Sequence, residues 1–218
     1  MAHALAFRHG LGQSLFAPEH NSLNVNDVQS FAASAFARNN ITVLGTGIDQ
    51  QTLSGLVENA FKDTVSVSSF STSASKYFGG ETRVENSSGP QTVFIGYGAT
   101  GAPSAEIATL AAYLSPSPSV KWSQGLSPLS SLPEGTSAQT VYLPYSDATL
   151  FGLLIQSSTA AAAKEASKSA VTAMKAAAKS ITAEGLQSAV AKAKFSAASA
   201  IESRDGLVNT LVSGVRLT

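Results

Sequence analysis

Apolar residues recur at helical spacing in two segments near the start of the chain. Asn24 and Asp27 are typical of a helix N-terminus, because a short side-chain oxygen accepts from free backbone amides and an acid favours the positive end of the helix dipole. Asp49 is a suitable cap for a second helix. The predicted apolar faces are Val28, Phe31, Ala32, Ala35 and Phe36 in the first helix, and Leu53, Leu56, Val57, Ala60 and Phe61 in the second.

A β-branched run, Ile41–Leu44, lies between these two helical patterns. Asn39 and Asn40 precede the run and Gly45 follows it, so turn-forming residues bound it on both sides. The first 62 residues are therefore predicted to fold as helix, strand and helix.

The rest of the chain mixes strand-like and helix-like patterns. Segments 64–76 and 115–135 are rich in Ser or Pro and are interpreted as a linker and an irregular segment, the second with one helical turn near 129–132. Because strands and helices do not alternate regularly, we predict an α+β fold, a mostly antiparallel sheet with helices packed on one face. The predicted elements are a strand over 91–97, a helix over 103–114 that begins at Pro103, a hairpin of strands 138–145 and 149–158, a helix over 160–181 and a last helix capped by Thr182.

Glycines after the 91–97 strand give it a superficial likeness to a dinucleotide-binding turn. Gly96, Gly98 and Gly101 do not have the G-x-G-x-x-G spacing, and no acidic residue ends a following strand. They are interpreted as turn residues with positive φ, and the same is expected of at least one residue of the pair Gly79-Gly80.

The low charge of the chain indicates surfaces that partners cover. Charged residues make up 13% of the 218 residues and hydrophobic ones 44%, where a soluble domain carries about a quarter charged. A bland Ser/Ala-rich globular protein explains this composition equally well. Fourteen basic residues offset fourteen acidic ones, which argues against a nucleic-acid partner. No apolar run approaches the ~20 residues that span a bilayer.

Candidate catalytic chemistry is sparse. The chain has no cysteine and three histidines, His3, His9 and His20, which lack the spacing of metal ligands on one helix. Tyr145-Ser146-Asp147 resembles part of a catalytic triad, but a hairpin tip explains it better, since no histidine follows it. We therefore predict no catalytic, cofactor-binding or metal-binding residues.

Several stretches, taken in order, resemble the family of the mitochondrial processing peptidases and their respiratory-chain relatives. The resemblance covers about residues 2–213, and it is specific because the motifs occur in the family's order and spacing. The stretches are Ala4–Pro18, Val25–Phe36 followed by Ile41–Ile48, Tyr77–Arg83 with its Gly-Gly-Glu, Tyr145–Gly152 with Tyr-Ser-Asp and Leu-Phe-Gly, and Leu186–Ile201 with Ala193-Lys194 inside it.

One departure bears on which branch of the family the chain resembles. Peptidase α subunits have a glycine-rich loop after the helix that ends at Leu114, and active peptidases carry an Arg and a Tyr there. This chain has Ser115-Pro-Ser-Pro-Ser-Val-Lys instead. Its Pro118–Lys121 is similar to the matching stretch of the respiratory-chain core subunits. The resemblance thus implies a structural, non-catalytic subunit of ubiquinol–cytochrome c reductase on the matrix side of the mitochondrial inner membrane, bound to a companion core subunit and to others of that complex. A processing-peptidase fragment and a stand-alone binding domain remain the alternatives.

The resemblance also implies an organisation into halves. Residues 1–62 are expected to end the N-terminal half, 63–88 to form the linker with Gly-Gly-Glu, and 89–218 to form a C-terminal half that lacks its end. The family's zinc motif, H-x-x-E-H, would lie upstream, and Met1 is interpreted as a start residue placed before an internal segment. Since unpaired sheet edges promote association, Ile41–Leu44 is expected to pair with the later sheet, within one chain or by exchange between two.

Overall fold

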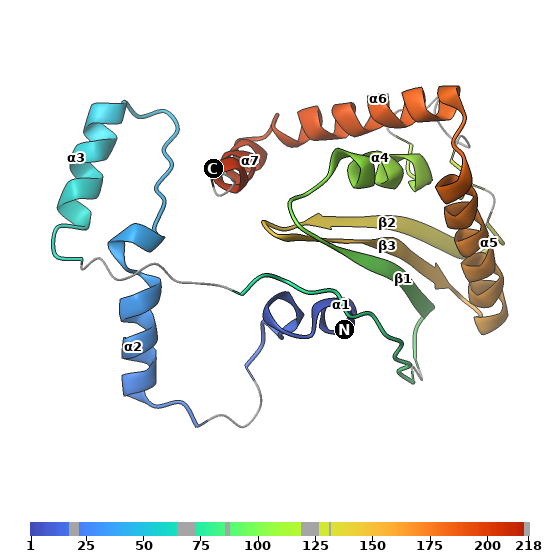
Figure 1. The fold of residues 1–218 in the computed structure, drawn as a ribbon, viewed down its shortest axis with the longest axis horizontal. Coiled ribbons are helices and arrows are strands. Elements are labelled where there is room, and N and C mark those ends of the chain that lie inside the picture. Colours follow the sequence, from blue (N-terminus) through green and yellow to red (C-terminus); the bar gives the residue numbers. More distant parts are fainter. Residues whose placement is uncertain (18–21, 65–72, 86–87, 119–126, 131, 216–218) are drawn as a thin grey trace. The chain divides into compact units, whose positions relative to one another are not determined.

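A computed structural model describes residues 1–17, 22–64, 73–85, 88–118, 127–130 and 132–215. The chain divides into two compact units, one formed by residues 1–13 and 74–207 and the other by residues 14–73 and 208–218. Each unit is described by itself. The elements, labelled in Figure 1 apart from the short 3-10 helices, are α1 (Ala2–Phe7), η1 (Gly10–Gly12), α2 (Val25–Ala35), η2 (Arg38–Asn40), α3 (Gln50–Ala60), β1 (Gln91–Thr100), α4 (Ala105–Leu114), β2 (Thr136–Pro144), β3 (Ala148–Ser157), α5 (Ala160–Lys179), α6 (Ala183–Ala200) and α7 (Arg204–Val215).

An antiparallel sheet of order β1-β3-β2 forms the centre of the first unit. β2 and β3 are the predicted hairpin, with Pro144 opposite Thr149 next to the tip. β3 also pairs with β1, so that Tyr97 and Tyr142 both lie opposite Phe151 from the two sides. The predicted α+β class is confirmed.

The two faces of the sheet carry different helices, as Figure 1 shows. Because side chains alternate along a strand, Phe151, Leu153 and Ile155 of β3 point to the face that α4 and α5 cover, where the larger core lies. Leu150, on the opposite face, packs with Phe7 of α1 in a smaller core. The long helices therefore cover one face, as predicted, and the short α1 adds contacts on the other.

Alanines make the buried stripe of α5. Ala163, Ala166, Ala170 and Ala177 are its buried residues, at the i, i+3, i+7 and i+14 spacing of one helix face. Side chains this small let a helix axis approach a sheet closely. The Thr159 hydroxyl caps this helix and the Thr182 hydroxyl caps α6, each by accepting from a backbone amide. The helix predicted over 160–181 from its composition is confirmed by α5.

The second unit contains α2 and α3, whose predicted caps are confirmed. Asn24 and Asp27 form a reciprocal capping box with two 3.0 Å hydrogen bonds. The Asp49 carboxylate accepts from Thr52 N at 2.9 Å, and hydrogen bonds from the side chain and then the backbone of Thr52 lower the pKa of Asp49. Neither helix has a buried residue, and Phe31 is 65% exposed. The apolar faces predicted from the sequence therefore exist, but they remain partly exposed.

The predicted strand over Ile41–Leu44 is wrong. Ile41 has the extended φ of −111° that its β-branched side chain favours, yet the segment has no strand assignment and the sheet of the described residues ends at β1 and β2. Local propensity sets the backbone angles, but a strand also needs a hydrogen-bonded neighbour. Within the single chain, the described part of the sheet does not pair with this segment either, while pairing by exchange between two chains stays a prediction.

Two glycine predictions have opposite outcomes. Gly79 and Gly80 have φ of 73° and 146°, as predicted, and Gly101 has φ of 101°. Gly96 and Gly98 instead lie inside β1 without positive φ, because the strand runs on to Thr100. A Cβ on Gly98 would come within 2.4 Å of the Tyr77 ring. Close approach, and not turn geometry, requires glycine there.

Smaller differences concern helix boundaries. Ser104, not Pro103, precedes α4, and its hydroxyl accepts from Ile107 N as an N-cap. Residues 127–130 form a turn, and the helical turn expected near 129–132 includes residue 131, which lies outside the described residues. Neither α1 nor α7 is predicted from the apolar pattern. The short helix α1 lies in a segment for which the sequence analysis predicts no secondary structure. Trp122 lies outside the described residues, as does most of the predicted 64–76 linker.

Candidate functional site

The N-terminal helix contacts the hairpin tip through one polar pair. His3 Nε2 lies 2.5 Å from the Tyr145 hydroxyl, with the two rings edge-to-face at a centroid distance of 5.7 Å. Burial lowers the pKa of His3, with a smaller effect from the N-terminal ammonium, and burial raises the pKa of Tyr145. Near neutral pH the imidazole and the phenol of this pair are therefore both uncharged.

Asp147 has a structural role at the same tip. Its carboxylate accepts from Ser75 N at 2.8 Å, and its carbonyl accepts from Gly101 N at 2.8 Å. The tip thus ties the segment around residue 75 to the end of β1. Interpreting Tyr145-Ser146-Asp147 as a hairpin tip is confirmed by this geometry, although His3 does approach Tyr145 from far upstream.

The segment with the Gly-Gly-Glu motif runs along α1. Phe78 N donates to Ala6 O at 2.8 Å, the Arg8 guanidinium lies 4.7 Å from the centre of the Phe78 ring, and His9 meets the same ring edge-to-face. The positive φ of Gly79 and Gly80 turns the chain directly after these contacts. Residues 6–9 and Phe78, from two stretches that the resemblance singles out, therefore form one contact surface.

Lys192 of α6 joins that helix to the end of α4. Its ammonium donates to Ser115 O at 2.9 Å, and burial lowers the pKa of this lysine. Ser115 is the C-cap of α4, where free carbonyls and the negative end of the helix dipole favour a cation. Sequence patterns contain no signal for this contact, because 77 residues separate the two partners.

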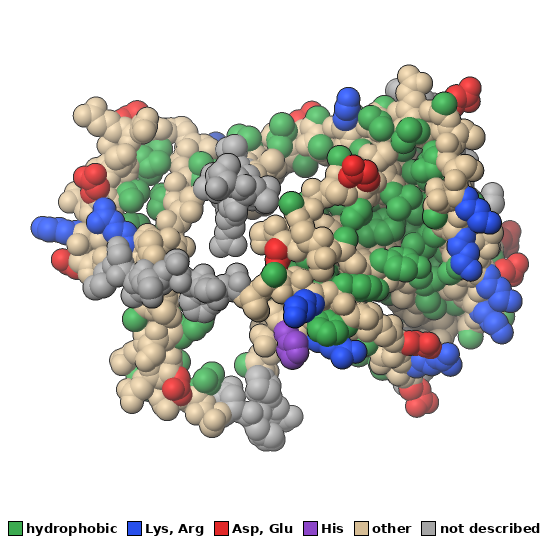
Figure 2. Space-filling model, viewed as in Figure 1, with side chains coloured by type: hydrophobic (Ala, Val, Ile, Leu, Met, Phe, Trp, Pro, Cys, Tyr) green, Lys and Arg blue, Asp and Glu red, His purple; other side chains and the backbone are tan. Residues whose placement is uncertain are grey.

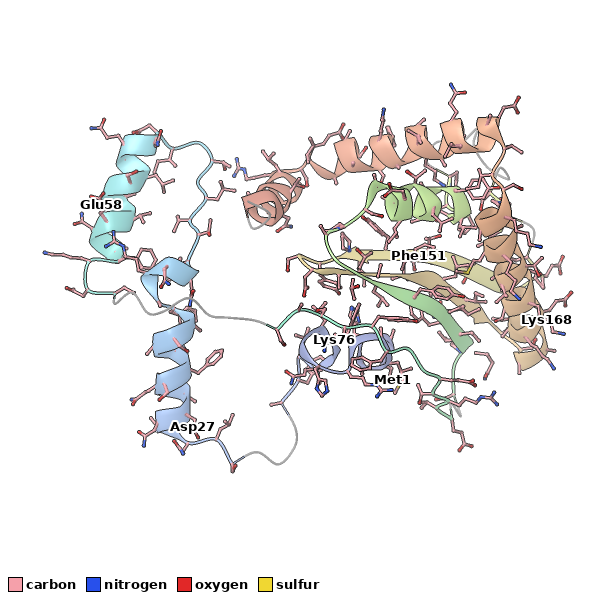
Figure 3. All side chains as sticks on the ribbon, viewed as in Figure 1. Met1, Asp27, Glu58, Lys76, Phe151 and Lys168 are labelled. Atoms are coloured by element: carbon pink, nitrogen blue, oxygen red, sulfur yellow. The ribbon has the colours of Figure 1, made fainter. Side chains whose placement is uncertain are left out.

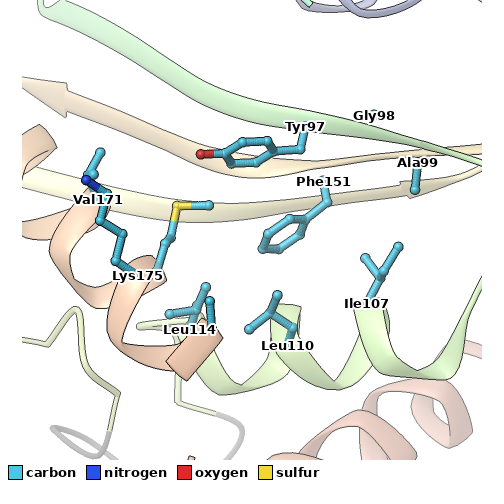
Figure 4. A pocket seen from close by; sticks show the side chains of 11 residues that line it. Tyr97, Gly98, Ala99, Ile107, Leu110, Leu114, Phe151, Val171 and Lys175 are labelled. Carbon is cyan, nitrogen blue, oxygen red and sulfur yellow. The ribbon is translucent and has the colours of Figure 1, made fainter. Parts of the chain in front are cut away.

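An apolar cavity of about 360 Å³ opens between the sheet, α4 and α5. Figure 4 shows the rings of Tyr97 and Phe151 on one side of it and Leu110 of α4 opposite. Lys175 of α5 is the one charged residue among those that line it. Sequence reasoning missed this cavity, since its walls come from β1, β3, α4 and α5, which meet only in the folded chain.

The sequence analysis predicts that none of the three histidines is part of a metal site. His3 contacts Tyr145 and His9 contacts Phe78, while His20 lies outside the described residues. Within the part of the chain that the structure describes, no group of three or more His, Cys, Asp or Glu side chains is arranged to hold a metal ion. In the same residues, no helix is both long and apolar enough to cross a membrane.

The antiparallel sheet and its helices place the first unit in the α+β class, consistent with a half-domain of the processing-peptidase-like fold. The chain is 39% identical over 217 residues to a protein of Cryptococcus neoformans named cytochrome b-c1 complex subunit 2, mitochondrial, across 95% of the chain and 50% of that protein. Proteins of the same name from Neurospora crassa and Yarrowia lipolytica are 39% and 34% identical, across 95% and 98% of the chain and 48% and 52% of the relatives. Over nearly all of its length, the chain is therefore similar to these subunits.

Two further results describe the extent of this similarity. The chain spans about half the length of the curated relatives it matches. No family model matches the chain.

Proposed function

We propose that the chain is part of a non-catalytic core subunit of mitochondrial ubiquinol–cytochrome c reductase, with the role of core protein 2. It lies on the matrix side of the inner membrane and supports the assembly and stability of the complex during electron transport. The observation that carries the proposal is the 39% identity over 217 residues to a subunit of that name. The match covers 95% of the chain.

The residues available for chemistry support a structural role. The chain has no cysteine, and the histidine side chains that the structure describes contact aromatic residues at the α1 surface. Asp147 is used to hold Ser75 N. These side chains connect segments of the fold, so we assign no catalytic, cofactor-binding or metal-binding residue.

Exposed apolar faces support the partner proposal. On α2, Val28 and Phe31 are 58% and 65% exposed. Contiguous exposed apolar surface marks contact sites in soluble proteins. We propose core protein 1 and other subunits of the same complex as the partners.

The predicted division of the chain is also part of this proposal. Residues 1–62 would end the N-terminal half, 63–88 would link the halves, and 89–218 would form most of the C-terminal half. The grouping of β1, β2 and β3 with α4, α5 and α6 in one unit is compatible with a half-domain. The grouping of residues 1–13 with that unit reflects the contacts of α1 with the sheet.

A chimeric subunit tests the proposal. The matching segment of the Yarrowia lipolytica subunit, 222 residues at 34% identity, is replaced by this chain in a strain that lacks its own copy. Native electrophoresis then reports assembly, and antimycin-sensitive reduction of cytochrome c by ubiquinol reports activity. We expect both to return. The strain with its own subunit restored and the strain with an empty vector are the controls.

The processing-peptidase alternative predicts a different result. A peptidase fragment would leave the complex unassembled, and the full-length parent would cleave basic presequence peptides. The relatives described above all carry the subunit name, which does not favour this alternative. Absence of the complex together with presequence cleavage would overturn the proposal.

A further inference from the structure

The cavity between the sheet, α4 and α5 has a composition that fits an amphiphile with one apolar chain. We propose that it binds a single-chain fatty acid, with the acyl chain between Phe151 and Leu110 and the carboxylate at the ammonium of Lys175. This inference rests on the cavity and on α5, and it does not depend on the proposed role in a respiratory complex.

The walls of the cavity favour an apolar ligand. Tyr97 and Phe151 contribute aromatic rings from neighbouring strands, Leu110 and Leu114 contribute from α4, and Met174 contributes from α5. Figure 4 shows the side chains of both strands and of α4 directed at the same space. Ligand pockets are commonly apolar with a few polar groups that orient the ligand. Here the Tyr97 hydroxyl and Lys175 are those groups.

The volume of the cavity selects one chain. About 360 Å³ holds roughly a dozen groups of the size of a water molecule, at ~30 Å³ each, and a methylene group is of similar size. A single acyl chain therefore fills the space, whereas a phospholipid with two chains does not fit. A protein partner needs about 800 Å² of surface from each side for a stable contact, more than a cavity of this size offers by itself.

The charge of α5 supplies the anionic preference. Lys164, Lys168, Lys175 and Lys179 are exposed and follow one another at spacings of four and seven residues, so they lie along one stripe of the helix. Val171, in the same stripe, lines the cavity. Figure 2 shows the Lys side chains gathered along this edge of the molecule beside a hydrophobic area, and Figure 3 places Lys168 on the side of α5 away from Phe151.

The field of such a stripe attracts anions toward the mouth of the cavity. Glu165 is the one acidic residue of the helix, and at ~100° per residue it lies off the stripe. A carboxylate at Lys175 therefore meets positive charge along the helix, while its chain leaves water. A fatty alcohol in the same cavity would make the apolar contacts of the fatty acid but would lack its charge interaction with Lys175.

A photoreactive fatty acid with a diazirine in its chain tests the proposal on the full 218-residue chain. After irradiation, peptide mass spectrometry maps the labelled residues. We expect label on 97–99, 107–114 and 171–178, competition by laurate, whose chain matches the length that the cavity holds, and at least tenfold weaker competition by the alcohol of the same length. Label spread over the exposed faces of α2 and α3 would show non-specific adsorption and would overturn the proposal.

Two charge variants on one helix make the matched comparison. Lys175→Glu removes the cation that lines the cavity, and Lys179→Glu makes the same change one turn on, at a residue that does not line it. We expect laurate affinity to fall about tenfold or more in the first and by less than about twofold in the second, since exposed charges at a distance are screened. Equal effects of the two variants would overturn the proposal.

A cavity-filling pair addresses the apolar part separately. Ala178 lines the cavity and Ala176 does not, and both are exposed on α5, so Ala178→Phe and Ala176→Phe carry the same risk to folding. Only the first should abolish labelling at 107–114, with helical circular dichroism unchanged in both. Binding to anionic phospholipid vesicles or to an acidic peptide, without labelling of the cavity by the free acid, would assign the stripe to another partner and contradict the proposal.

Discussion

The phenol of Tyr145, at the tip of the β2–β3 hairpin, hydrogen bonds to Nε2 of His3, a residue 142 positions earlier in the chain. This contact joins the first helix to the tip of the hairpin, and both side chains are partly buried. It explains why residues 1–13 group with the later sheet and not with the segment that follows them directly.

Removal of this hydrogen bond should destabilise the first unit. We expect Tyr145→Phe and His3→Phe each to lower the free energy of unfolding by about 0.5–1.5 kcal/mol. The double variant should lose less than the sum, because each change removes the same bond. Urea unfolding measures this cycle. Tyr97→Phe, at a half-exposed ring without this bond, is the control and should change little; additive losses would contradict the prediction.

The same pair should make stability depend on pH. Since burial lowers the pKa of His3 in the folded chain below its unfolded value of 6.5, the unfolded state binds more protons between these two values. Stability is therefore fully present above pH 6.5 and falls as pH drops through that value toward the folded pKa. Urea unfolding between pH 8 and pH 5 should show a steeper loss for the natural chain than for His3→Asn. Parallel curves would refute this explanation.

Gly98 should not tolerate a side chain. A Cβ there would lie 2.4 Å from the Tyr77 ring and 3.1 Å from the buried Phe7, so Gly98→Ala should cost about 1–3 kcal/mol. Gly55 of α3 has nothing within 4 Å of the same atom, and Gly55→Ala should stabilise by about 0.5–1 kcal/mol through helix propensity. Thermal unfolding compares the two. Combining Gly98→Ala with Tyr77→Ala should recover part of the loss, and a neutral Gly98→Ala would exclude steric overlap as the reason for the glycine.

Lys192 should stabilise the end of α4. Lys192→Met keeps the aliphatic stem and removes the hydrogen bond to Ser115 O, so we expect a loss of about 0.5–1.5 kcal/mol. Lys194→Met, at an exposed residue on the same helix, should stay within about 0.5 kcal/mol. Chemical unfolding measures both variants. Equal small effects would show that the contact contributes nothing.

Zinc should not bind tightly to the chain. Dialysis against zinc, followed by metal analysis, should find far less than one ion per chain, because the chain has no cysteine and its described histidines contact aromatic rings. Presequence peptides incubated with the chain should stay intact. A stoichiometric, chelator-resistant ion would contradict this prediction, and His20→Ala would then show whether that histidine is a ligand.

Local patterns determined most of the secondary structure of this protein. The capping residues Asn24, Asp49 and Thr182 begin helices where the sequence predicts, and the turn around Ser146 closes the predicted hairpin. Each of these features depends on groups only a few residues apart, so both interacting groups can be identified from the local sequence. The family resemblance likewise depends on ordered motifs in the sequence.

Only the tertiary structure decided the features that need distant partners. Ile41–Leu44 has strand propensity but no neighbour to bond, so it forms no strand. Gly98 is a glycine because Tyr77 packs on it, and the His3–Tyr145 pair and the apolar cavity join elements that the sequence places far apart. The angles of one residue follow from its own side chain, whereas pairing, close approach and enclosed space depend on where the whole chain brings its segments together.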